Sequence, residues 1–308
     1  MPVSDPPGGA VSRRRLLAAA ALAAAGGCAG GPPGRERIVD LATGREIDEA
    51  ELLVQLRGCD VALLGELHDN PLHHRRRGAL LAALGADSPV FAEHLPRGRR
   101  VQFGTDLKAS LVDAGFDARA WDWPLHEPLF AAIARSGAPL AGANAPDALV
   151  RRVAREGHAA LPAEYAAAID AAPLAPAAQA ALHADLVDGH CGHLGGTRLE
   201  AMRWAQRARD AAMALTLAEA LAARRGAGRS APVVLVAGNG HVRTDYGVAQ
   251  LLARPLPAAR CLAVAFLEHG AGLAQAPYTH AWLTAPVTRE DPCAGLAARM
   301  QPGASAPR

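Results

Sequence analysis

The chain has 308 residues, of which 50% are hydrophobic and 4% aromatic, with 32 basic and 30 acidic side chains. This length allows a sizeable hydrophobic core, and the apolar fraction excludes an intrinsically disordered protein. The balanced charge and the few aromatic residues argue against a nucleic-acid partner.

The first 27 residues predict an export signal. Arginines at 13–15 precede an apolar run over 16–25, which is too short to span a bilayer but has the length of a signal-peptide core. The arginines resemble a twin-arginine signal, and the sequence AGGC that ends at Cys28 resembles a bacterial lipobox. We therefore expect Cys28 to be lipidated and the protein to lie at the periplasmic face of a bacterial membrane.

The remaining chain is formally neutral and, besides Cys28, contains four cysteines. Without residues 1–27, 29 basic and 29 acidic side chains are left. No C-x-x-C pair occurs, so the cysteines do not indicate a zinc knuckle or a thioredoxin-type site. An oxidising compartment permits disulfides, but the sequence leaves the pairing open. Cys59 and Cys261 flank apolar runs and are expected to be buried free thiols.

Short apolar runs bounded by turn residues predict strands. They span residues 61–64, 89–92, 139–143, 232–237 and 261–267, with a further edge strand over 280–283. Helical patterns between them cover 71–84, 125–136 and 246–252. Continuous apolar strands that alternate with helices are typical of a parallel sheet buried on both faces. The predicted fold class is therefore α/β, a mainly parallel sheet flanked by helices.

A helical insertion interrupts this alternation. Residues 147–229 contain no comparable apolar run and are rich in Ala, Leu, Arg and Glu, and one long helix is expected over 195–225. We interpret the segment as an inserted all-helical subdomain or lid. The expected organisation is an export signal (1–27), a linker (28–37), an α/β core (38–146 and 230–290), the insertion (147–229) and a tail (291–308).

Polar side chains collect where the predicted strands end. In an open parallel sheet, ligands bind in the crevice at the carboxyl ends of the strands. Four strand ends supply the following candidates: Glu66, His68, Glu93, Asn144, Asn239 and His241. Four such ends in succession favour a shared site over unrelated loop residues.

The residue types alone do not decide which chemistry this site performs. The carboxylates Glu66 and Glu93 and the imidazoles His68 and His241 suit a divalent transition metal such as Mn, Co, Zn or Fe. The same four side chains could act as general acids and bases without a metal. They could also hydrogen-bond a ligand whose body lies against apolar walls.

Further histidines and arginines are less clearly placed. His193 lies in the insertion and could serve as a soft ligand to a metal or haem from a lid loop, or could be an exposed loop residue. Arg207 could face the cleft or an exposed helix surface. His73 and His74 are expected to be solvated, and His126 is assigned no role.

Seven motifs together carry a resemblance to a known family. They are VALLGELHDN (61–70), FAEHLPR (91–97), WDWPLHEPLF (121–130), GAN (142–144), CGHL (191–194), QRARDAAM (206–213) and GNGHVRTDYG (238–247). In this combination the chain resembles the ChaN-type haem-binding lipoproteins. These belong to a wider Tiki/TraB-like superfamily marked by two G-x-x-H motifs and a glutamate. The resemblance covers roughly residues 35–285.

The resemblance implies a membrane-anchored protein with an α/β core that binds haem and is linked to iron acquisition. His68 and His241 match the histidines of the two G-x-x-H motifs, and Glu93 matches the glutamate. His193 and Tyr246 are the implied candidates for contacting or ligating haem iron. His94 departs from the family pattern, in which an apolar residue such as methionine is common.

Two functions follow as alternatives. In the first, the protein binds haem in the envelope without turnover, on an apolar surface beside the Glu/His cleft. Arg207 would meet its propionates, and Asn144 and Asn239 would be among the cofactor-binding residues. Its partners would be haem, the membrane through Cys28, haem-uptake machinery and, as one option, a second copy of the chain. In the second, Glu66, His68, Glu93 and His241 hold a metal that activates water for hydrolysis.

Overall fold

The structure is a computed structural model that describes residues 34–291, 293 and 294. The predicted export signal, Cys28, the first part of the linker and most of the tail lie outside the described residues. The residues from Glu36 onwards form one compact unit, to which the following description applies. In the described part of the chain, no helix is long and apolar enough to cross a membrane.

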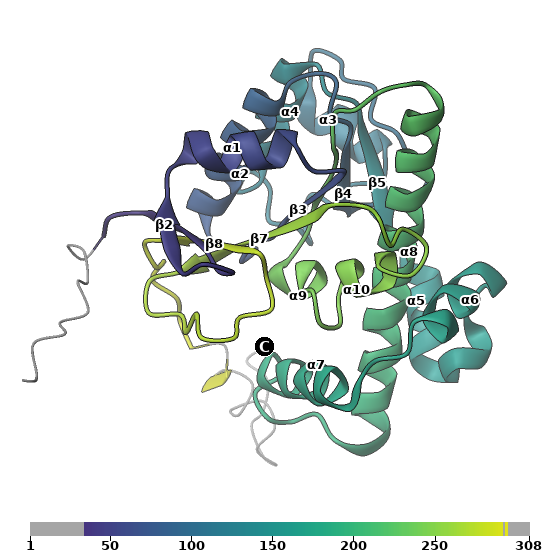
Figure 1. The fold of residues 1–308 in the computed structure, drawn as a ribbon. Helices are drawn as coiled ribbons and strands as arrows, with labels where there is room; N and C mark the ends of the chain where they lie inside the picture. Colours follow the sequence, from purple (N-terminus) through teal and green to yellow (C-terminus); the bar gives the residue numbers. More distant parts are fainter. Residues whose placement is uncertain (1–33, 292, 295–308) are drawn as a thin grey trace, which may run out of the picture. The chain divides into compact units, whose positions relative to one another are not determined.

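Eight described strands form a single sheet. They are β1 (Arg37–Asp40), β2 (Arg45–Ile47), β3 (Val61–Leu64), β4 (Val90–Pro96), β5 (Leu140–Asn144), β6 (Val233–Val236), β7 (Cys261–Glu268) and β8 (His280–Thr284). Their order is β2-β1-β8-β7-β3-β6-β4-β5 (Figure 1). All pairs from β8 to β5 are parallel, whereas β1 pairs antiparallel with both β8 and β2.

Helices cover both faces of this sheet. The described helices are α1 (Glu49–Arg57), α2 (Pro71–Leu84), α3 (Leu107–Asp113), α4 (Glu127–Ser136), α5 (Asp147–Glu156), the 3-10 helix η1 (Gly157–Ala160), α6 (Ala163–Ala171), α7 (Pro176–Asp188), α8 (Gly196–Gly226), α9 (Asn239–Val242) and α10 (Val248–Leu252). Helices α1 to α4 pack on one face, and α5, α6, α8 and α10 pack on the other (Figure 1).

The central strand β3 shows why the sequence contains continuous apolar runs. Side chains alternate between the two faces of a strand. Ala62 and Leu64 therefore pack against α1 to α4, while Val61 and Leu63 pack against α8 and α10. A strand with helices on both faces needs apolar residues at every position, and this confirms the predicted fold class.

The predicted strands and helices are present, with two differences in the sheet. The strand predicted over 280–283 is β8, but it lies inside the sheet between β7 and β1, so its position at the edge was wrong. The edge at this end of the sheet is β2 of the β1–β2 hairpin. The sequence reasoning missed the hairpin because its strands have only four and three residues. Asn70 caps α2 by accepting a hydrogen bond from the Leu72 amide, and Pro71 occupies the first turn.

Helices α5 to α8 make up the predicted insertion. No strand occurs among the described residues between β5 and β6, and α8 covers 31 residues. Buried residues of α8, such as Ala208 and Leu217, share one core with Val233 and Leu235 of β6. The helical segment therefore packs directly against the sheet.

Candidate functional site

The site is built at the carboxyl ends of four neighbouring strands. β3, β6, β4 and β5 are adjacent in the sheet. Glu66 follows β3, Glu93 lies in β4, Asn144 ends β5, and His241 lies in the short helix α9 after β6. Parallel strands end at the same edge, so segments more than 170 residues apart in sequence meet there, as expected.

Both glycines of the G-x-x-H motifs are needed for this close approach. A Cβ atom on Gly65 would lie 2.1 Å from Oδ1 of Asn239, and one on Gly238 would lie 2.8 Å from Nε2 of His68. Each motif therefore leaves room for a side chain of the other loop. The two loops pack together only because both positions lack a side chain.

Replacing Gly238 by alanine is expected to displace His68 and to destabilise the protein by about 1–3 kcal/mol, as for other overpacked interior positions. The control is Gly272→Ala, because nothing lies within 4 Å of a Cβ atom there. Urea unfolding of the two variants and the wild type measures the difference. Equal stability of both variants would contradict the close packing of the two loops.

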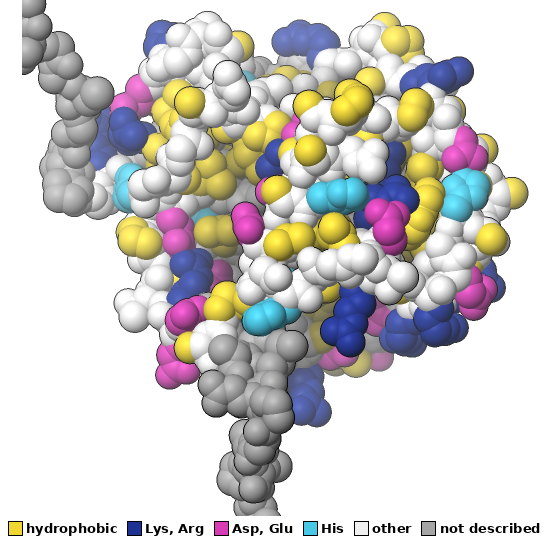
Figure 2. All heavy atoms as spheres, turned by 90° about the horizontal axis from the view of Figure 1, so that it is seen from below, with side chains coloured by type: hydrophobic (Ala, Val, Ile, Leu, Met, Phe, Trp, Pro, Cys, Tyr) yellow, Lys and Arg dark blue, Asp and Glu magenta, His cyan; other side chains and the backbone are white. Residues whose placement is uncertain are grey.

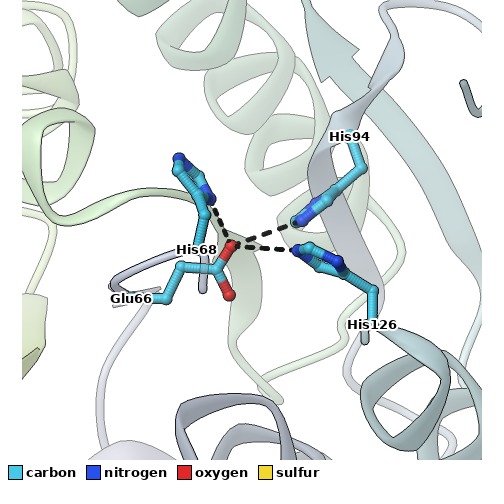
Figure 3. A group of neighbouring side chains, drawn as sticks. All are labelled: Glu66, His68, His94 and His126. Atoms are coloured by element: carbon cyan, nitrogen blue, oxygen red, sulfur yellow. Dashed lines mark hydrogen bonds and ion pairs between the residues drawn. The ribbon is translucent and has the colours of Figure 1, made fainter. Parts of the chain in front are cut away.

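The first group of polar side chains surrounds the Glu66 carboxylate. We call it the Glu66 cluster, and it consists of Glu66, His68, His74, Arg77, His94 and His126. Oε1 of Glu66 lies 2.6 Å from Nδ1 of His68, 3.4 Å from Nε2 of His94 and 3.7 Å from Nε2 of His126. Figure 3 shows these three imidazoles converging on the carboxylate from different segments of the chain.

The second carboxylate oxygen of Glu66 is held from helix α2. Arg77 forms an ion pair with Oε2, and Nδ1 of His74 lies 3.0 Å from the same oxygen. Nε2 of His74 lies 2.9 Å from the carbonyl oxygen of His68 and donates to it, so Nδ1 accepts from Arg77 at 3.2 Å. The carboxylate is therefore fixed in orientation.

Burial sets the protonation states in the Glu66 cluster. Burial lowers the pKa of His74 to about 4 and that of His126 to about 3, and it holds the pKa of His94 well below its usual range. Burial also lowers the pKa of Arg77, to about 9, which leaves the guanidinium charged at neutral pH. The three buried imidazoles of His74, His94 and His126 are thus neutral beside one buried carboxylate–guanidinium pair.

The second group consists of Glu93, Asp210 and His241, which we call the His241 triad. Nε2 of His241 lies 3.2 Å from Oε1 of Glu93, and Nδ1 lies 2.6 Å from Oδ1 of Asp210. The amide of Gly238 donates to Oε2 of Glu93 at 2.7 Å. All three side chains are buried.

The two carboxylates keep the His241 imidazole protonated. Burial alone would lower its pKa, but the negative charges of Glu93 and Asp210 raise it to about 10. Burial would likewise raise the pKa of Glu93, yet the charge of His241 holds it well below the usual range. Burial raises the pKa of Asp210, although the charge of His241 acts in the opposite direction.

A pocket of about 380 Å³ opens beside both groups. Its walls include Glu93 and His241 from the triad, His94 from the Glu66 cluster, Trp121 and Arg209. Trp121 also packs against His68 and His94, so it is both a packing residue and part of the pocket wall. The pocket therefore offers a small ligand both charged and aromatic contacts.

Comparison with known proteins identifies the family. A family model described as haem-binding uptake, Tiki superfamily, ChaN matches residues 52–252, which include the Glu66 cluster and the His241 triad. The chain belongs to this family. The resemblance drawn from the seven motifs is thereby confirmed.

A solved ChaN structure has the same fold. The structure titled "Cofacial heme binding to ChaN of Campylobacter jejuni" superposes with a TM-score of 0.62 at 18% identity. The alignment covers 82% of this chain and 97% of that chain. No curated protein sequence gave a significant match.

In this ChaN-family chain, three predicted cofactor-binding residues are internal. Tyr246 is 1% exposed and its hydroxyl donates to Asp185. Arg207 donates to the carbonyl oxygens of Tyr246 and Ala172. Asn239 is buried and donates to the carbonyl oxygen of Phe266. Their polar atoms bind the protein's own backbone or side chains and do not face the pocket.

The two other predicted cofactor-binding residues are accessible. Asn144 lines the pocket and donates to the carbonyl oxygen of Glu93. His193 is exposed in the loop between α7 and α8. Arg209, two residues after Arg207 on α8, lines the pocket and has no ion-pair partner among the described residues. Side chains two residues apart on a helix point in different directions. Arg207 is therefore internal, whereas Arg209 lines the pocket.

The predicted metal-binding set is divided between the two groups. Glu66 and His68 lie in the Glu66 cluster, and Glu93 and His241 lie in the triad. The sequence reasoning assigned no role to His126 and wrongly expected His73 and His74 to be solvated, since all three are buried. His74 and Arg77 are three residues apart and share a face of α2, and this spacing is the sequence signal that could have placed them together.

A disulfide joins the α7–α8 loop to the C-terminal segment. Cys191 and Cys293 are bonded, 102 residues apart in sequence. Cys59 and Cys261 are free, as expected, and burial raises the pKa of each thiol to about 12. The bond therefore holds the loop that carries His193.

Proposed function

We propose that this protein is a haem-binding lipoprotein of the cell envelope that takes part in haem or iron uptake. The observation that carries the proposal is the match to the haem-binding uptake family across residues 52–252. The same fold in ChaN of Campylobacter jejuni, which binds haem cofacially, supports it. The family favours haem binding over the hydrolase alternative.

We infer that haem iron is bound by His193. Haem iron needs an accessible ligand. His193 is the exposed imidazole among the predicted candidates, whereas the Tyr246 hydroxyl is internal and bound to Asp185. The neighbouring disulfide limits the motion of this loop, and such pre-organisation favours binding. Figure 2 shows the molecule from below, with single apolar and histidine side chains scattered among basic, acidic and other polar ones.

The pocket and the proposed haem position are separate. At a rise of about 1.5 Å per residue, Arg209 lies roughly 20 Å along α8 from its first residue, Gly196. Haem ligated by His193 would therefore lie near the start of α8, and the pocket residue Arg209 lies further along that helix. Haem would bind at the α7–α8 loop.

Adding haemin to the purified protein is expected to give a saturable Soret shift at micromolar concentration, and His193→Ala is expected to weaken binding at least tenfold. His158→Ala is the control, because His158 is also an exposed histidine but lies on η1. Absorbance titration measures all three proteins. Saturable binding that is unchanged in His193→Ala would reject this ligand but not the function, and no Soret shift in the wild type would reject both.

The envelope location is proposed from the sequence and supported by the disulfide. Structural disulfides persist mainly in exported proteins. Cys28→Ser is expected to move the protein from the membrane fraction to the soluble fraction, because the lipid anchor would be lost. Immunoblots of fractionated cells measure this, and an unchanged distribution would contradict lipidation at Cys28.

A further inference from the structure

Four ligand atoms from three chain segments face one another within the Glu66 cluster. They belong to Glu66, His68, His94 and His126, and all lie within 4.8 Å of one another. Metal–ligand bonds of about 2.0–2.1 Å place neighbouring ligands of a tetrahedral site roughly 3.3 Å apart. The distances of 2.6, 3.4 and 3.7 Å from Oε1 of Glu66 to the three imidazole nitrogens bracket this value.

Two of these imidazoles lack hydrogen-bond partners. His94 and His126 are 3% and 1% exposed, and neither ring nitrogen of either residue has a hydrogen-bond partner in the described part of the chain. Buried polar groups are normally satisfied, and leaving one unpaired costs about 1–3 kcal/mol. A bound cation would supply a partner for Nε2 of both residues.

The Glu66 carboxylate is positioned to offer one oxygen. Arg77 holds Oε2, and Oε1 is directed at the three imidazoles. Support of a ligating carboxylate by further hydrogen bonds is a regular feature of metal sites. The positive charge of Arg77 opposes cation binding, but Arg77 is paired with Oε2 and leaves Oε1 to the imidazoles.

We propose that Glu66 Oε1, His68 Nδ1, His94 Nε2 and His126 Nε2 bind one divalent first-row transition ion, with Zn²⁺ as the best-suited species. Three imidazoles and one carboxylate form a donor set that Zn²⁺ accepts in tetrahedral geometry. His94 and His126 lie outside both G-x-x-H motifs. His241 is not part of the set, because Glu93 and Asp210 occupy its two ring nitrogens. The site goes beyond the proposed haem function and does not depend on it.

The test is calorimetric titration of Zn²⁺ into purified protein from which metals have been removed with a chelator. We expect one ion per chain, and at least tenfold weaker binding in His94→Leu and in His126→Leu. Leucine suits these buried positions, so the fold should persist, and circular dichroism checks it. His280→Leu is the matched control, because His280 is also buried and its Nε2 is also unpaired, but it lies on β8 outside the cluster.

Half-exposed His68 provides a variant with less risk to the fold. His68→Ala should also weaken Zn²⁺ binding at least tenfold. Absence of saturable Zn²⁺ binding by the wild type would overturn the proposal. So would unchanged affinity in the folded His94, His126 or His68 variants, or an equal loss in His280→Leu. Haemin affinity of the same variants should stay unchanged, so failure of the metal site and failure of the haem proposal give different results.

Discussion

Arg77→Met is expected to lower the free energy of unfolding by about 3–5 kcal/mol, the usual effect of removing one partner of a buried ion pair. Neither Arg77 nor Glu66 has an exposed side-chain surface, so the carboxylate would stay buried without its main counter-charge. Urea unfolding followed by circular dichroism measures the change.

The neighbouring Arg76 provides the control. Arg76 pairs with Glu36 at 2.8 Å, but its side chain is 42% exposed, so Arg76→Met should cost less than about 1 kcal/mol. The double variant Glu66→Leu/Arg77→Met should recover most of the loss, because both charges are then removed from the interior. Equal effects of Arg76→Met and Arg77→Met would contradict the buried pair.

His241→Gln is expected to destabilise the protein by about 3–5 kcal/mol at pH 6.5, since two buried carboxylates lose the cation between them. The effect should depend on pH. The folded-state pKa of about 10 lies above the unfolded value of about 6.5, so the stabilisation is fully present below pH 6.5 and is lost as the pH rises through 10. The wild type should therefore lose stability between pH 6.5 and 10, and the variant should lose much less.

Unfolding curves of both proteins at pH 6.5, 8 and 10 test this dependence. Other groups titrate over the same range, so the difference between wild type and variant is the informative quantity. His158→Gln is the control, because its imidazole is 43% exposed and pairs with Asp170 at the surface. A difference between wild type and His241→Gln that does not shrink towards pH 10 would show that His241 is not held protonated by its neighbours.

The central part of the fold could be predicted from the sequence because each strand is buried on both faces. The runs over 61–64 and 232–237 are apolar at every position, and the structure places β3 and β6 there. The β1–β2 hairpin has a weaker signal, since Glu46 and Arg45 are exposed and only Ile47 of β2 is buried. The position of β8 within the sheet depends on its pairing with that hairpin. Because the hairpin was missed, β8 was wrongly predicted to be an edge strand.

Only the part of the site that lies at the strand ends could be predicted from the sequence. Glu66, Glu93 and His241 lie at the shared edge because parallel strands end there. The partners that divide them into two groups come from helices and from the loop before α4. Asp210 belongs to α8, Arg77 to α2, and His126 precedes α4. Their direction depends on how each helix is rotated against the sheet, which strand spacing does not determine.

Haem content of the protein isolated from its own membranes tests the central claim most directly. Cells grown with haemin are fractionated, the protein is purified from the membrane fraction, and haem and protein are measured in the same sample. The proposed function predicts haem bound to the wild type and largely absent from His193→Ala, with the His158→Ala control unchanged. Wild-type protein that is free of haem, and that takes up none when haemin is added, would contradict it.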